Sequence, residues 1–137
     1  ALWCQHLKAT SQHNISAISD EQVREAYSMG FCALSGEDVD GLPMIWVRLA
    51  LSEVSKLTPS LAVLNTWLAQ DATLRDDANK RGLCFVYDLS GVGLKNVTFN
   101  PMFLSAAITG ATSHPSRFSR VWLLDAPHIF LAAWSVG

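Results

Sequence analysis

The fold is decided by one stretch, His114-Pro115-Ser116-Arg117-Phe118-Ser119-Arg120-Val121-Trp122-Leu123-Leu124-Asp125-Ala126-Pro127. Pro115 is expected to end the helix before it, because a proline pushes the preceding residue out of the α region. Val121 to Leu124 is an apolar run, which is typical of a parallel strand that is covered on both faces. Asp125-Ala126-Pro127 is expected to begin the next helix, because proline suits the first helical position. The stretch therefore predicts a buried strand between two helices.

The same order of strand, polar turn and proline-led helix occurs elsewhere in the chain. One apolar strand is expected within Leu42 to Leu51, and Thr58-Pro59 after it combines a capping hydroxyl with a proline suited to begin a helix. A second strand is expected at Leu83 to Leu89, followed by a helix that begins at Asn100-Pro101. Strands and helices that alternate in this way form βαβ units with right-handed crossovers. The sequence therefore predicts an α/β fold whose small, mainly parallel sheet has three such strands.

Two helices are expected before the first of these strands. One lies within Ala1 to Thr10, and the other follows the capping box Ser19-Asp20-Glu21-Gln22. Ser35 to Gly41 is expected to be a polar turn. We therefore divide the chain into an N-terminal helical segment, residues 1–35, and an α/β core, residues 36–137, which together form effectively one domain.

The helix that begins at Pro59 has an apolar stripe at helical spacing, which predicts one buried side. The members of the stripe are Leu61, Leu64, Leu68 and Ala72. The polar residues of the opposite side are expected to face solvent, and they are Gln70, Arg75, Asp76 and Lys80.

The composition is apolar for a chain of 137 residues. Half of the residues are hydrophobic and 16% are charged, whereas ordinary soluble domains have about 25% charged residues. Such a chain has either a large core or an apolar surface that meets a ligand, a partner or a membrane. The net charge of −2 and the scattered basic residues argue against a nucleic-acid-binding protein. Cys4, Cys32 and Cys84 lie far apart, which indicates reduced cytosolic thiols.

No motif of a catalytic or metal site is complete. Gly91-Val92-Gly93 follows a strand, but Asn96 stands at the third glycine position of a dinucleotide-binding loop. Asp38-Val39-Asp40-Gly41 lacks the first acidic ligand and the final glutamate of a calcium loop, so it is interpreted as a turn. The histidines lack metal-ligand spacing and are expected at the surface or at helix caps: His6, His13, His114 and His128. We therefore predict no cofactor, no metal and no catalytic residue.

Asp88 is the best-placed single acid, because it stands at the carboxyl end of its strand, where ligands bind in open α/β sheets. Two interpretations of Asp88 stay open. In the first, a small α/β enzyme uses this carboxylate together with a second polar group. In the second, which we favour, the side chain holds the following turn through hydrogen bonds to the backbone.

Three pieces of the sequence, in order, resemble the CRAL-TRIO lipid-binding family. Asp38 to Pro43 is similar to the family's D-x-D-G-R-P lead into its first sheet strand. Gly82 to Gly91 is similar to the family's strand with D-x-x-G after it. Pro115 to Phe130 resembles a family pattern that begins with Y-P-x-R and ends with N-x-P-x-x-F. The resemblance covers residues 39–136.

The sequence departs from the family's pattern in several places. Leu42 stands where the family often has arginine, His114 replaces a tyrosine and Asp125 replaces an asparagine. In the family, further segments follow the last helix, namely a gate helix and strands with the basic residue that contacts inositol phosphate. The present sequence stops before these segments. We therefore expect a pocket that is open or is completed by sequence outside this chain, and no phosphoinositide headgroup recognition.

The resemblance implies a hydrophobic lipid pocket that is floored by the sheet and roofed by helices. It implies a protein that extracts one lipid, shields it from water and releases it at a membrane, like the phosphatidylinositol transfer members, and that is not an enzyme. Its partners would be a hydrophobic small molecule, a transient membrane surface and other domains of a longer parent protein, and its location would be cytoplasmic. From position and resemblance jointly, we expect the pocket to be lined by Phe85, Tyr87, Leu104, Ile108, Ile129, Phe130 and Trp134.

A second hypothesis stays open, in which the chain is a regulatory interaction domain that has kept the fold and lost the cavity. A filled core would favour it, because lipid retention requires a continuous apolar cavity. Where such a cavity exists, burying an acyl chain gains about 0.8 kcal/mol per methylene. The volume of the cavity therefore discriminates between the two hypotheses.

Overall fold

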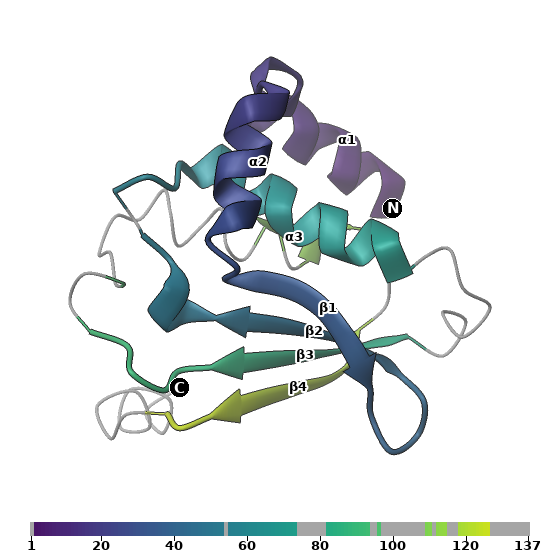
Figure 1. Ribbon diagram of the computed structural model, residues 1–137. Coiled ribbons are helices and arrows are strands. Elements are labelled where there is room, and N and C mark those ends of the chain that lie inside the picture. Colours follow the sequence, from purple (N-terminus) through teal and green to yellow (C-terminus); the bar gives the residue numbers. More distant parts are fainter. Residues whose placement is uncertain are drawn as a thin grey trace, which may run out of the picture.

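The computed structural model of the chain places helices on one side of a β-sheet (Figure 1). The residues that the structure describes are 2–53, 55–73, 82–93, 96, 109–110, 112–114 and 118–126. Within them, α1 spans Leu2–Gln12, α2 spans Asp20–Ser28 and α3 spans Pro59–Thr73. Two short 3-10 helices, η1 and η2, span Ile15–Ala17 and Leu49–Leu51.

The strands lie side by side in the order in which they occur in the chain. They are β1 (Cys32–Glu37), β2 (Pro43–Arg48), β3 (Leu83–Asp88) and β4 (Phe118–Leu124). β2, β3 and β4 are parallel, and they are the three strands that the sequence predicts. The expected α/β fold with a small, mainly parallel sheet is therefore confirmed.

β1 was not predicted. We expected a turn from Ser35 onward, but β1 continues to Glu37 and crosses the boundary expected after residue 35. It pairs antiparallel with β2 at the edge of the sheet. Cys32 is its only buried residue, so the strand carries no apolar alternation that would indicate a half-buried strand.

The predicted starts of α2 and α3 are confirmed. Ser19 forms the complete capping box at the beginning of α2. The hydroxyl of Thr58 accepts a hydrogen bond from the N–H of Leu61 at 3.2 Å, which caps α3. The helix starts expected at Asn100-Pro101 and at Pro127 lie outside the described residues.

α3 is covered on more than one side, as Figure 1 shows by its place between the sheet and α1. Leu61 belongs to the main core together with Ile45 of β2 and Phe85 of β3. Val63, on a different side of the helix, packs with Ala9 of α1. The sheet and α1 therefore bury separate sides of the same helix.

Because α3 is buried on two sides, the prediction that its polar side faces solvent is wrong. Gln70 is 0% exposed, whereas Ala72 of the apolar stripe is exposed and Leu64 and Leu68 are half-buried. The expectation was wrong because it assumed one buried side, as in a helix at the surface. The other polar residues expected on that side lie outside the described residues: Arg75, Asp76 and Lys80.

β4 is also less covered than the sequence predicts. Val121 is 57% exposed and Trp122, which points to the other side of the sheet, is 53% exposed. The strand is at the edge of the sheet and α3 packs over β1 and β2. The apolar run of β4 was expected to be covered on both faces of the sheet. Among the described strands, only β3 is buried on both faces.

The segment before Pro115 packs against α3. Residues 109–112 are helical where described, and a Cβ added to Gly110 would lie 3.3 Å from the Cα of Val63. His114 is 2% exposed, and its Nε2 lies 2.8 Å from Oδ1 of Asp71 on α3. A surface position of His114 is therefore excluded, because its ring is enclosed beside α3; the residue follows the helical residue 112 by two positions.

Candidate functional site

The side of the sheet that faces away from α3 is the candidate site, and we call it the open face. Successive side chains along a strand point to opposite sides. Phe85 points to the α3 core, so its neighbour Val86 points to the open face. The strand register places Trp46 and Trp122 on either side of Val86, and Ala33 beyond Trp46. These residues form one row across the sheet, which we call the tryptophan row.

The tryptophan row is buried in its middle, at Val86, and exposed at its two ends, Ala33 and Trp122. Val86 is buried, Trp46 is half-buried and Trp122 is 53% exposed. Met44 and Cys84 add a second row of apolar side chains beside it. Covering apolar surface gains about 25 cal/mol per Å², so the exposed part of this floor favours an apolar occupant.

A cavity of about 410 Å³ opens on the open face beside β1. Ligand pockets have volumes of about 300–1,000 Å³, so the cavity is large enough for a small ligand. The register of β1 against β2 shifts between Leu34 and Glu37, at the place where the cavity opens. Gly36 has a φ of +73°, and a Cβ added to it would lie 3.5 Å from Cε of Met44. The lining residues are Gly30, Ala33, Ser35, Gly36, Met44, Trp46 and Arg48.

One end of the open face is fixed by an ion-pair cluster. Nη1 of Arg120 donates to Oδ2 of Asp38 at 2.7 Å, and Nη2 pairs with Asp40. The other oxygen of Asp38 accepts from the N–H groups of Asp40 and Leu42, each at 2.9 Å. The hydrogen bond from Leu42, above all, lowers the pKa of Asp38, and Asp40 raises the pKa of Arg120. The turn predicted at Asp38 to Gly41 is confirmed. Its two carboxylates bind the guanidinium of Arg120.

Arg48 lies at the opposite end of the open face. Its guanidinium carbon is 5.7 Å from the centre of the Trp46 ring, a distance typical of a cation–π contact. Asp88 lies in register with Arg48, and its Oδ1 accepts from the hydroxyl and the N–H of Ser90, at 2.5 and 3.0 Å. These hydrogen bonds lower the pKa of Asp88. The interpretation that Asp88 holds its turn is therefore confirmed.

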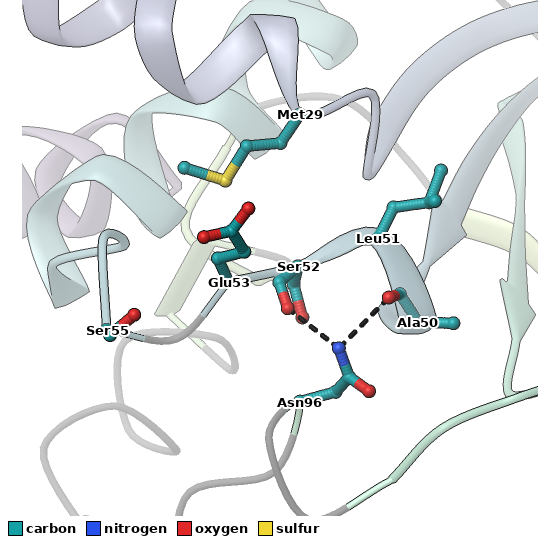
Figure 2. Close-up of a pocket in the computed structure, with 7 residues that line it drawn as sticks. All are labelled: Met29, Ala50, Leu51, Ser52, Glu53, Ser55 and Asn96. Atoms are coloured by element: carbon teal, nitrogen blue, oxygen red, sulfur yellow. Dashed lines mark hydrogen bonds between the residues drawn. The ribbon is translucent and has the colours of Figure 1, made fainter.

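A second cavity, of about 550 Å³, lies beside η2 and the end of α2 (Figure 2). Nδ2 of Asn96 donates to the carbonyl oxygens of Ala50 and Ser52, at 3.0 and 2.8 Å. Its Oδ1 accepts from the N–H of Gly93 at 3.0 Å. Asn96 therefore joins two loops, and its amide is used within the protein. The cavity is lined by Met29, Ala50, Leu51, Ser52, Glu53, Ser55 and Asn96.

The titratable residues of the described part do not assemble a metal centre. In this part, no three His, Cys, Asp or Glu side chains gather where they could hold a metal ion. Cys32 and Cys84 are buried free thiols, and burial raises the pKa of Cys32 to about 12. None of the helices described is long and apolar enough to cross a bilayer.

The expected pocket-lining residues fall into two groups. Phe85 and Tyr87 stack on each other with ring centres 5.8 Å apart, on the side of the sheet that α3 covers. Phe85 is 0% exposed and belongs to the main core, and Tyr87 is half-buried beside it. The others lie outside the described residues and stay predictions: Leu104, Ile108, Ile129, Phe130 and Trp134.

In the described part of the chain, a mainly parallel sheet has helices on one face and an apolar floor on the other, which defines an α/β protein suited to bind an apolar ligand. The chain matches the CRAL/TRIO domain over residues 27–136, and it belongs to this family. CRAL-TRIO domains generally bind lipophilic small molecules, and members are generally lipid-binding transfer proteins rather than enzymes.

A curated relative supports the same assignment. The chain is 25% identical over 118 residues to a CRAL-TRIO domain-containing protein of Schizosaccharomyces pombe. The match covers 85% of this chain and 26% of the relative. The chain therefore spans about a quarter of the length of the curated relative that it matches.

Sequence reasoning missed Trp46, Trp122 and Arg48 as site residues. A signal was present, because Met44, Trp46 and Arg48 alternate along β2 and share one side of the strand. Ile45 and Val47 between them are equally apolar, so the pattern alone did not distinguish the core side from the open face. The structure supplies this distinction through the position of α3.

Proposed function

We propose that the chain binds one hydrophobic lipid on the open face and carries it between membranes. The observation that supports this proposal is the tryptophan row, an apolar floor that crosses the whole described sheet and meets a cavity of about 410 Å³. The membership of the chain in a family of generally lipid-binding domains agrees with such a floor. The proposal moves the expected lipid contact from Phe85 to the other face of the sheet.

The floor alone would hold a lipid weakly. A fully buried acyl chain gains about 0.8 kcal/mol per methylene, so ten methylenes that are covered on one side only would gain roughly 4 kcal/mol. A dissociation constant near 1 mM corresponds to about that free energy. Tight retention therefore requires a second apolar wall. The predicted lining residues outside the described part remain candidates for it: Leu104, Ile108, Ile129, Phe130 and Trp134.

Lipid extraction tests the binding directly. Protein purified from a cellular host is extracted with organic solvent, and mass spectrometry measures the amount of each lipid per chain. The protein is then mixed with liposomes and re-isolated to measure uptake. We expect close to one lipid per chain. A preparation that contains no lipid and takes none from liposomes would refute lipid binding and favour the interaction-domain hypothesis.

Two neighbouring residues of β4 provide a matched pair of variants. Trp122 points to the open face and Val121 to the other side, and their exposed fractions are 53% and 57%. Trp122→Asp should lose most of the bound lipid, because it places a charge on the tryptophan row. Val121→Asp should keep it, with a similar melting temperature. The reverse result would place the lipid on the side where Phe85 and Tyr87 lie.

Transfer is a separate measurement. A fluorescent lipid, quenched in donor vesicles, should appear in acceptor vesicles faster when the protein is added, and Trp122→Asp should remove this increase. Uptake without transfer would retain lipid binding and exclude the carrier role.

A further inference from the structure

We propose that Arg48 binds the anionic head of the lipid on the open face. The inference rests on the proposed lipid binding and adds the charge class of the ligand. The ligand would be an amphiphile with a carboxylate or a phosphate at one end of a hydrocarbon chain.

Arg48 lies where the cavity meets the tryptophan row. It shares β2 with Trp46, two residues away on the same side, and both line the cavity of about 410 Å³. The guanidinium lies over the Trp46 ring at 5.7 Å. A stacked guanidinium has a restricted orientation, and its planar fork matches carboxylate and phosphate oxygens in a two-point contact. The position therefore places a cation beside an apolar floor.

Arg48 and Arg120, which both lie on the open face, differ in their partners. Arg120 is paired with the carboxylates of Asp38 and Asp40, which neutralise its charge. Within the described part of the chain, no carboxylate lies within ion-pair distance of Arg48. Asp88 is next to it in the register and its Oδ1 binds Ser90, and the nearby charge of Arg48 also contributes, as a lesser cause, to the lowered pKa of Asp88. Among the described residues of the open face, Arg48 is therefore the cation without an ion pair, and its charge can be offered to an anion from outside.

The geometry also gives the direction of the ligand. Trp122 stands two strands away from Trp46, which corresponds to about 10 Å at the usual spacing of strands. A head group at Arg48 would place the start of the hydrocarbon chain at the half-buried Trp46, on the row that leads past the buried Val86 to the exposed Trp122. The Arg120 cluster lies beside the path and offers no free cation to the head group. A neutral lipid would make the apolar contacts with the tryptophan row but no ion pair with Arg48.

Three ligands of equal chain length separate these contributions: dodecanoate, dodecyl phosphate and dodecanol. Each is titrated below its micelle concentration into the 137-residue chain, with tryptophan fluorescence as the signal. The wild type should bind both anions about tenfold more tightly than the alcohol, equivalent to about 1.4 kcal/mol. The ratio of the dissociation constants of dodecanoate and dodecyl phosphate shows whether the site prefers a carboxylate or a phosphate. The preference should decrease at high salt, because Arg48 is exposed.

Variants of Arg48 test the assignment. Arg48→Gln should weaken the binding of both anions about tenfold more than it weakens the binding of dodecanol, and Arg48→Lys should keep part of the preference for anions. Arg24→Gln makes the same change of charge on an exposed residue of α2 and should have no effect. Equal losses for all three ligands, or no loss, in Arg48→Gln would overturn the proposal. A wild type that binds dodecanol and the anions equally refutes only this inference, whereas one that binds none refutes lipid binding itself.

Discussion

Replacing Asn96 by alanine should destabilise the protein strongly, because one side chain joins backbone groups from two loops. Its amide nitrogen donates to the carbonyls of Ala50 and Ser52, and its oxygen accepts from Gly93. The residue is 6% exposed, so water would replace these hydrogen bonds poorly. Each neutral hydrogen bond contributes about 1 kcal/mol net. We expect Asn96→Ala to lower the free energy of unfolding by about 3 kcal/mol, or the melting temperature by roughly 10 °C.

Urea unfolding followed by tryptophan fluorescence measures this free energy, and circular dichroism measures the melting temperature. Asn65→Leu is a suitable control, because Asn65 of α3 is also buried. Its Nδ2 donates to the carbonyl of Leu61 one turn earlier, and its Oδ1 has no hydrogen-bond partner in the described part of the structure. Leucine has a similar size, so this variant should stay within about 1 kcal/mol of the wild type. If Asn96→Ala unfolds at the wild-type urea concentration, the linking role of Asn96 is refuted.

Two further predictions concern charge and pH. Burial raises the pKa of Cys32 to about 12, from 9.0 in an exposed thiol, so stability should be complete below pH 9 and should decrease toward pH 12, because only the unfolded thiol ionises there. A Cys32→Ala variant should lack this part of the alkaline loss in urea titrations, and an identical loss in both proteins would contradict the assignment. Arg120→Met should shift acid unfolding to a higher pH at low salt, because Arg120 helps to hold the pKa of Asp38 low and that stability is lost as the pH falls through the folded pKa. The shift should be small, since the hydrogen bond from Leu42 is the main cause, and a shift toward lower pH would exclude the ion pair as a stabilising contact.

The parallel part of the fold could be predicted because each of its strands is an apolar run with strong boundaries. Pro59 and the capping box at Ser19 mark helix starts by local chemistry, which needs no tertiary information. β1 could not be found in this way, since an exposed edge strand gains its order from pairing with β2 rather than from burial. The prediction that Gln70 faces solvent was wrong for a related reason. The sequence of α3 does not reveal that α1 covers a second side of this helix.

The candidate site was harder to predict than the fold. Periodicity divides a strand into two sides, but it does not say which side the helices cover. Along β2, Ile45 and Trp46 are both apolar, and only the crossover geometry assigns the first to the core and the second to the open face. Phe85, which the sequence predicts to line the pocket, lies on the side that α3 covers, opposite to the proposed lipid contact. Arg48 carries no sequence signal of a site, because its contact with Trp46 depends on the pleat of β2.

The contact between Arg120 and Asp38 has a consequence for the order of folding. The two residues are 82 positions apart in the chain. Closing a long loop costs conformational entropy before its contacts form, and pairings between distant segments slow folding. The hairpin of β1 and β2 needs only local contacts, whereas this ion pair requires β3 to be in place and β4 to have docked. The Arg120 cluster therefore marks the completion of the sheet, and its formation should belong to the last cooperative step of folding.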